Sequence, residues 1–236
     1  MSAGPNFFVD EKQIVAVHDR MIASDSDLTR HIALIGTCLE CLSLLPEFHK
    51  EGDVTELNVL RLGVRCFNSG ASALRLLRCG YFQPAVVMIR DLLEVRCLMD
   101  LFVREPRALQ DWLSMGDKDR MKHFKPVRVR ERLDQFDGVN GDQRRAAYNL
   151  FSEIAVHPNP NGHFLISPEH ATRIGPFFSY EYFRPGIEEL VSHLSSATAA
   201  FCNLFETDNL AALNAKEKFA TQLAKWRLRY FPPKNG

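Results

Sequence analysis

The chain has 236 residues, enough for one large hydrophobic core, and 46% of them are apolar while 25% are charged. These values are ordinary for a globular domain and exclude disorder over most of the chain. The 29 basic and 29 acidic residues cancel. Proteins that grip long nucleic acids usually carry a basic excess, so any contact with nucleic acid here must come from a local patch.

The sequence predicts neither a secretory signal nor a membrane span. The N-terminal residues 1–6 lack a charged region followed by an apolar one, and no apolar run approaches the roughly eighteen residues of a spanning helix. We therefore expect a cytoplasmic protein without a membrane partner. Six cysteines include the pair Cys38 and Cys41 in a CxxC arrangement, but no second pair completes a zinc site.

Apolar residues recur at helical spacing along most of the chain, and prolines, glycines and capping residues mark where helices begin and end. The longest pattern ends at Gly80, a residue suited to a left-handed C-cap. Pro84 fits the first turn of the next helix. The connection between these two helices is so short that they must be antiparallel neighbours. The predicted helices are 28–45, 55–79, 84–105, 107–115, 142–156, 185–207 and 210–230.

The helical pattern breaks between His157 and Pro185. The short apolar runs 163–167 and 175–179 lie on either side of Pro168. They predict a short β-hairpin or an ordered loop, near residues 158–184, that covers one end of the bundle. The fold class is therefore all-α: an up-and-down helical bundle in a single domain spanning residues 1–236.

Two charged residues lie on an apolar side of the predicted helix 84–105. Arg90 and Glu94 share that side with Leu98 and Leu101. Charges are costly to bury unless they pair with each other or with neighbours. This arrangement indicates either a structural ion pair or part of a polar pocket.

A stripe of polar side chains follows the predicted helix 55–79. An arginine presents a rigid fork of donors that suits phosphate or carboxylate groups. The stripe is therefore either a binding surface for such groups or a solvated helix face. Its members, spaced by four, three, four and three residues, are Arg61, Arg65, Asn68, Ser72 and Arg75.

The end of the predicted helix 142–156 offers a candidate site. Glu153 and His157 are one helical turn apart. Because residues before proline avoid the α conformation, His157 ends its helix at Pro158 and can face a cleft. Its ordinary pKa near 6.5 suits acid–base chemistry. The alternative is a capping histidine that only holds the following segment in place.

The same segment lacks the motifs of two other kinds of chemistry. His157, His163 and His170 fall within fourteen residues, but there is no HExxH motif. Ser152 with His157 lacks the G-x-S-x-G turn of a serine hydrolase. We therefore expect neither a metal site nor a cofactor.

Short motifs are spread over the middle of the chain: Arg90-Asp-Leu-Leu-Glu94, Trp112, the spacing Tyr148-x3-Ser152-x4-His157-Pro158, and Gly175-Pro-Phe. Over about residues 55–205 they resemble a group of uncharacterised bacterial helical proteins related to the HEPN superfamily (higher eukaryotes and prokaryotes nucleotide-binding). The resemblance implies a helical bundle that often forms homodimers. It also implies metal-independent ribonuclease activity in active members, frequently in toxin–antitoxin and phage-defence systems.

The resemblance also implies a signature of an arginine, four to six residues and a histidine, in which the arginine stabilises phosphate and the histidine aids proton transfer. Counting back from His157, the arginine positions hold Leu150, Phe151 and Ser152. Arg90, on a neighbouring helix, is the candidate substitute. The sequence therefore favours binding over nuclease activity.

Three hypotheses follow. The first is a HEPN-like protein that binds RNA or a nucleotide in a defence or toxin–antitoxin context, through His157, Arg90 and Glu94 with Tyr148, Ser152, Glu153 and the stripe arginines. The second is a protein-interaction module with a cognate protein partner, in which these residues only hold the bundle together. The third is a small-molecule hydrolase that uses Glu153 or Glu94 as a base. A homodimer is expected.

Overall fold

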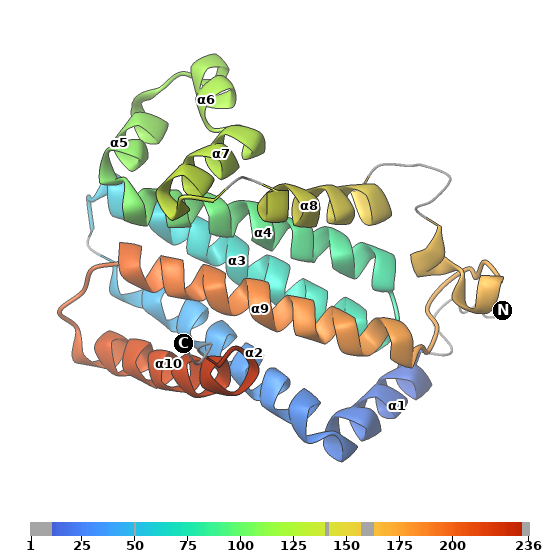
Figure 1. Ribbon diagram of the computed structural model, residues 1–236. Helices are drawn as coiled ribbons and strands as arrows, with labels where there is room; N and C mark the ends of the chain where they lie inside the picture. Colours follow the sequence, from blue (N-terminus) through green and yellow to red (C-terminus); the bar gives the residue numbers. More distant parts are fainter. Residues whose placement is uncertain (1–10, 50, 140–141, 157–162, 233–236) are drawn as a thin grey trace, which may run out of the picture.

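A computed structural model describes residues 11–49, 51–139, 142–156 and 163–232 (Figure 1). Within these ranges the chain forms helices joined by turns, and no strand occurs, so the all-α prediction is confirmed. The α-helices are α1 (Glu11–Ser24), α2 (Ser26–Leu44), α3 (Val54–Cys79), α4 (Phe82–Arg104), α5 (Pro106–Ser114), α6 (Asp117–His123), α7 (Pro126–Asp137), α8 (Asp142–Phe151), α9 (Tyr180–Leu204) and α10 (Leu210–Tyr230).

Capping residues explain several helix ends. The Asp25 carboxylate accepts hydrogen bonds from the backbone N–H groups of Asp27 and Leu28 at the start of α2, and Asn209 does the same for α10. Gly80 ends α3 at φ +85°, a left-handed conformation that favours glycine. These signals are local, which is why the sequence alone locates these ends.

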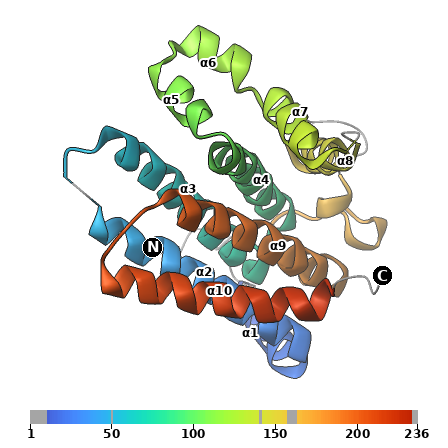
Figure 2. The same ribbon diagram turned by 60° about the vertical axis from the view of Figure 1, so that its left-hand side comes forward.

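Helices α2, α3, α4 and α9 enclose the main core, and close contacts fix their relative directions. Gly63 and Gly70 of α3 face Phe201 and Leu194 of α9, so α3 and α9 are antiparallel. A Cβ atom at Gly63 would lie 2.5 Å from the Phe201 ring. The glycines therefore allow the two helices to approach closely, and Figure 2 shows α3 and α9 as neighbours.

The up-and-down order holds from α2 through α4, but α9 runs parallel to α4. The Phe177 N–H, three residues before α9, donates to the Gly80 carbonyl at 3.2 Å, which places the start of α9 beside the start of α4. Helices α5 to α8 account for this direction. They carry the chain away from the end of α4 and back to its start (Figure 1).

Helix α10 packs antiparallel on α2. Trp226 Nε1 donates to His31 Nδ1 at 2.8 Å, and the Tyr230 hydroxyl donates to Asp27 at 2.7 Å. Trp226 is buried. Trp226 of α10 thus belongs to the core. The exposed basic residues beside it are Lys225, Arg227 and Arg229.

Helices α5, α6 and α7 form an arm beside α4 (Figures 1 and 2). Val129 and Leu133 of α7 insert into the core, whereas α6 has no buried residue. Helix α8 returns along α4 and is joined to α7 by the ion pairs of Arg144 with Asp134 and Asp137.

The predicted β-hairpin is wrong in the described part of the segment, and the ordered-loop alternative describes it. Residues 163–179 contain two short 3₁₀ turns, Phe164–Ile166 and Pro168–His170, followed by irregular backbone. Proline lacks the N–H that a strand ladder needs. One backbone hydrogen bond, from Arg173 to Ile166, crosses the loop, and Leu165 and Phe177 anchor it to the core.

Some helix boundaries differ from the prediction. Helix α9 begins at Tyr180, five residues early, and holds Pro185 inside it. The predicted helix 142–156 divides into α8 and a π-helical turn, Ser152–Val156, a kind of turn that is frequent at functional sites. Helices α1, α6 and α7 are not among the predicted elements.

One stretch of the described residues, Ser26–Phe48, is long and apolar enough to cross a membrane by length and composition alone. The expectation that no such run exists is therefore wrong. Half of its most apolar window is buried inside the fold, where Leu34, Ile35 and Leu42 belong to the core. This burial accounts for its apolar composition.

Candidate functional site

Four predicted site residues meet where the end of α8 and the π-helical turn after it lie against α4. The guanidinium of Arg90 donates from Nε to Ser152 Oγ at 2.9 Å and from Nη2 to the Tyr148 hydroxyl at 2.5 Å. The same Nη2 lies 2.9 Å from Glu94 Oε1. The Arg90 and Glu94 side chains are 18% and 25% exposed. Arg90 thus joins two helices in a partly buried polar cluster.

A second arginine reaches the same cluster from α7. The Arg130 guanidinium carbon lies 3.9 Å from the centroid of the Tyr148 ring, and that of Arg90 lies 4.7 Å from it. Arg130 is 7% exposed. Among the described residues its guanidinium has no hydrogen-bond or ion-pair partner. It makes a cation–π contact with the Tyr148 ring instead. Two arginines and one carboxylate give the cluster a local positive charge.

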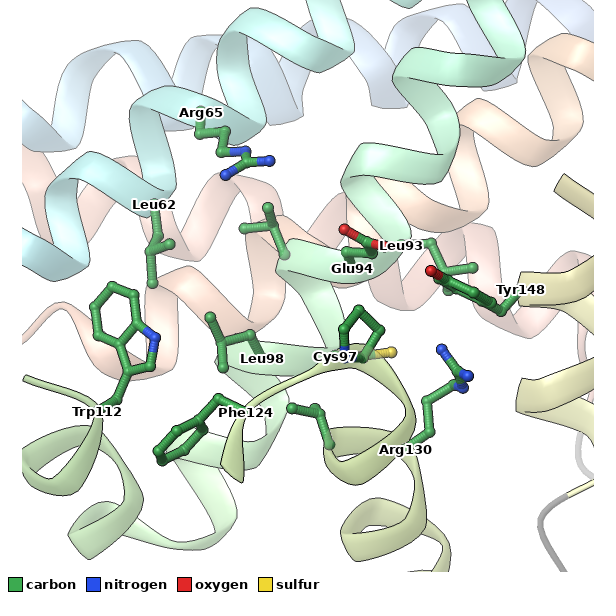
Figure 3. A pocket seen from close by; sticks show the side chains of 13 residues that line it. Leu62, Arg65, Leu93, Glu94, Cys97, Leu98, Trp112, Phe124, Arg130 and Tyr148 are labelled. Atoms are coloured by element: carbon green, nitrogen blue, oxygen red, sulfur yellow. The ribbon is translucent and has the colours of Figure 1, made fainter. Parts of the chain in front are cut away.

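A cavity of about 200 Å³ opens beside this cluster, between α3, α4, α5 and α7. Figure 3 shows Arg130 and Tyr148 on one side of it and the rings of Trp112 and Phe124 on the other. Leu62, Leu93 and Leu98 add apolar walls. An apolar cavity with a few convergent polar groups is the usual form of a small-ligand site.

The sequence of α7 explains why a charge faces this cavity. Val129, Arg130, Leu133 and Asp134 lie on one side of the helix and are all buried. The two apolar residues hold α7 in the core, so the neighbouring Arg130 is carried inward with them. Asp134 is paired with Arg144 of α8.

A shallow groove on the other side of Arg90 contains part of the arginine stripe. Arg61 and Arg65 line it together with Arg90 and Asp91. Arg65 and Ser69 both donate to the Asp91 carboxylate. Burial alone would raise the pKa of Asp91, but the hydrogen bonds outweigh it and hold that pKa below its ordinary value. The same hydrogen bonding raises the pKa of Arg65.

The remaining predicted residues are not all brought together. Arg75 lies about 15 Å farther along α3 than Arg65. It is exposed and lines neither the cavity nor the groove. Glu153 is exposed on the π-helical turn. His157 lies outside the described residues, so the predicted centre of the site stays a prediction.

Sequence reasoning missed Arg130 and the arm that carries it. The one signal available was the pattern of residues 126–137, in which Arg130 and Asp134 share the face of Val129 and Leu133. That pattern indicates buried charges only once the segment is taken as a helix.

A larger groove of about 810 Å³ lies between α5, α6 and α7. Phe124 lines both this groove and the smaller cavity, so the two adjoin. Arg128 and Arg132 are paired with Glu131 and Glu105. The positively charged or imidazole groups that line the groove are Lys122, His123, Lys125, Arg128 and Arg132.

Within the ranges that the structure covers, no group of three histidine, cysteine or acidic side chains is arranged to hold a metal ion. The Arg90 cluster instead offers donors for an anion. No protein-family model matches the chain, and neither a curated protein nor a solved structure shows significant similarity to it.

Proposed function

We propose that the chain is a HEPN-like helical protein that binds RNA or a nucleotide in the cavity beside Arg90 and Arg130. The proposal concerns binding. Cleavage would need the missing signature arginine to be replaced, and Arg90 is the candidate because it already contacts Tyr148 and Ser152.

The proposal rests mainly on Arg130, which is buried but whose guanidinium has no hydrogen-bond acceptor or ion-pair partner among the described residues. Arg130 as a whole residue is 7% exposed. An uncompensated buried charge is costly. A phosphate group at the cavity mouth would supply the missing partner, and arginine binds phosphate through two parallel hydrogen bonds.

The aromatic residues of the cavity support a ligand that also has a flat ring. Trp112 and Phe124 lie across the cavity from Arg130 (Figure 3). Bases stack on aromatic side chains, and each stacked base contributes about 1–3 kcal/mol.

The size of the cavity favours one unit of a longer ligand. Ligand sites for drug-sized molecules span roughly 300–1,000 Å³, so a cavity of about 200 Å³ admits a base or a phosphate but not a whole nucleotide. The remainder would lie in the adjoining groove with Lys122 and Lys125. We therefore favour a short single-stranded RNA over a free nucleotide.

The test is binding of a fluorescent single-stranded RNA, measured by anisotropy, with thermal shifts for ATP and GTP in parallel. Arg130→Ala should weaken RNA binding by roughly 10- to 100-fold, because it removes a desolvated phosphate contact. Arg20→Ala, an exposed arginine on α1, is the matched control and should bind like the parent. Incubating the RNA with the parent and with His157→Ala tests cleavage.

Equal binding by the Arg130 and Arg20 variants would contradict this site. If neither RNA nor nucleotides bind, the interaction-module hypothesis takes precedence. Its support is an exposed apolar row on α3, where Val54, Leu57 and Val64 are 68%, 38% and 44% exposed. A homodimer, measurable by sedimentation, would use such a row.

A further inference from the structure

Two cysteines from distant parts of the chain meet near the ends of α2 and α9. Cys41 Sγ lies 3.6 Å from Cys202 Sγ, although 161 positions separate them in the sequence. Cys41 is 1% exposed, whereas Cys202 is partly exposed, so solvent reaches the pair through Cys202. Among the described residues no other two cysteine sulfurs lie within hydrogen-bond distance.

The geometry is close to that of a disulfide. Disulfide sulfurs are about 2.05 Å apart, so the two sulfurs must approach by about 1.6 Å in total from their 3.6 Å separation. Cys41 lies three residues before the end of α2, and Cys202 lies two residues before the end of α9. The last turns of helices fray, so they absorb such a shift more easily than helix centres do.

A hydrogen bond and a nearby positive charge favour a thiolate at Cys41. The hydrogen bond from Cys202 lowers the pKa of the Cys41 thiol against the effect of burial, and the nearby Lys216 ammonium lowers it further. The acidic neighbour Glu40 acts in the opposite direction, but it is ion-paired with Lys218 at 2.6 Å.

Two other cysteines have thiol pKa values shifted in the opposite direction from that of Cys41. Burial raises the pKa of Cys38 and of Cys66 to about 12, and both are fully buried. A buried thiol with so high a pKa is inert toward oxidants. Cys41 is therefore chemically distinct from Cys38 and Cys66. The hydrogen bond with Cys41 raises the pKa of Cys202, so Cys202 keeps its proton while Cys41 carries the negative charge.

We propose that Cys41 and Cys202 form a reversible oxidation site, which a small hydroperoxide converts into a disulfide joining α2 to α9. The Cys41 thiolate attacks one oxygen of hydrogen peroxide, the O–O bond breaks, and the released hydroxide takes up a proton to become water. Cys202 then attacks the Cys41 sulfenic acid, the S–O bond breaks, and the oxygen leaves as a second water with the Cys202 proton. Two thiols lose two electrons to the peroxide, and an added dithiol returns them.

The test uses the native 236-residue chain exposed to hydrogen peroxide, after which free thiols are alkylated and counted by mass spectrometry. We expect two of the six thiols to be lost, a linked peptide that contains Cys41 and Cys202, and full recovery after dithiothreitol. The oxidised chain should also melt at a higher temperature, because the cross-link restricts the unfolded chain.

Cys202→Ser is the informative variant, since its partly exposed position tolerates the change, and it should give no linked peptide. Cys66→Ala is the matched control and should still give it. Six free thiols remaining in the parent after exposure would overturn the proposal, as would links to other cysteines. The thiol count and the linked peptide measured on the parent chain test the proposal even if a variant fails to fold.

Discussion

Arg90 carries more contacts than its sequence pattern indicates. It bonds to Glu94 in its own helix and also to Tyr148 and Ser152 in the next layer. Because it joins α4 to the end of α8, removing it would affect both the position of α8 and any anion bound there. Arg130 stacks on the same Tyr148 ring without an anionic partner in the described part of the chain. It is therefore the better residue for separating binding from structure.

Much of this cluster could be predicted from sequence, because two charges at positions i and i+4 on an apolar face require a polar environment. The sequence could not show which helix supplies that environment. Tyr148 and Ser152 meet Arg90 across about sixty residues, and Arg130 enters through a helix whose weak apolar pattern gave no prediction. Long-range packing decides these contacts.

Three buried histidines, His18, His31 and His193, predict how stability depends on pH. His18 lies flat against Phe183 with ring centroids 4.0 Å apart, and its Nδ1 bonds to the Arg78 carbonyl. Its Nε2, like Nδ1 of His193, is buried and has no hydrogen-bond partner in the part of the chain that the structure describes. Burial lowers the pKa of all three imidazoles below 6.5. Folding therefore favours the neutral rings, and their contribution to stability is complete above the unfolded pKa near 6.5.

We accordingly expect the free energy of unfolding to fall by roughly 1–3 kcal/mol between pH 7.5 and pH 5.5, since each group contributes at most about 1.4 kcal/mol per pH unit. Urea denaturation at the two pH values measures this. His18→Phe keeps the aromatic contact and should reduce the loss, whereas His49→Gln, at an exposed position, should not. A parent chain equally stable at both values would contradict the expectation.

At the level of elements, the turn between α3 and α4 depends on Gly80. Its φ of +85° strains any other residue, and an added Cβ would lie 2.3 Å from the Phe177 carbonyl oxygen. Gly138 at the end of α7 has φ +63°, and a Cβ added there would meet no described atom within 4 Å. The two glycines share the backbone requirement and differ in the surrounding space.

We expect Gly138→Ala to cost about 1–2 kcal/mol, the cost of a left-handed residue with a Cβ. Gly80→Ala should cost clearly more, about 3 kcal/mol or above, because the loop before α9 must also move. Chemical denaturation of both variants provides the comparison. Equal losses of unfolding free energy in the two variants would mean that the loop before α9 moves at little cost. The contact between Gly80 and Phe177 would then contribute little to stability.

The elements that the sequence predicts share strong local signals. Helices α3, α4 and α10 combine apolar periodicity with glycine or proline at their ends, and the predicted and observed bounds of α10 coincide. Helices α6 and α7 are too polar for that periodicity. Pro185 resembles a helix start because proline is common there, yet it lies inside α9. The apolar runs of 163–179 indicate strands, but they bury single side chains in a loop.

At the level of the whole molecule, burial is unevenly distributed. Helices α2, α3, α4 and α9 share one core, whereas α6 buries no residue and the arm packs mainly on α4 through α7. Regions with few buried apolar contacts open at lower free energies than the core. The candidate site lies at the junction of the two parts, between α4 in the core and α7 in the arm.

This division leads to an expectation for native-state hydrogen exchange. Amides of α6 and α7 should exchange through openings that cost less than global unfolding, while amides in the middle of α3, α4 and α9 should exchange only near the global value. Adding the single-stranded RNA should slow exchange in α7 and α8, because a ligand bridging Arg130 and the Arg90 cluster closes the opening. Protection that appears only elsewhere would place the ligand at another surface. Uniform exchange at the global value would show that the arm and the bundle unfold together, and the site would then be rigid before any ligand arrives.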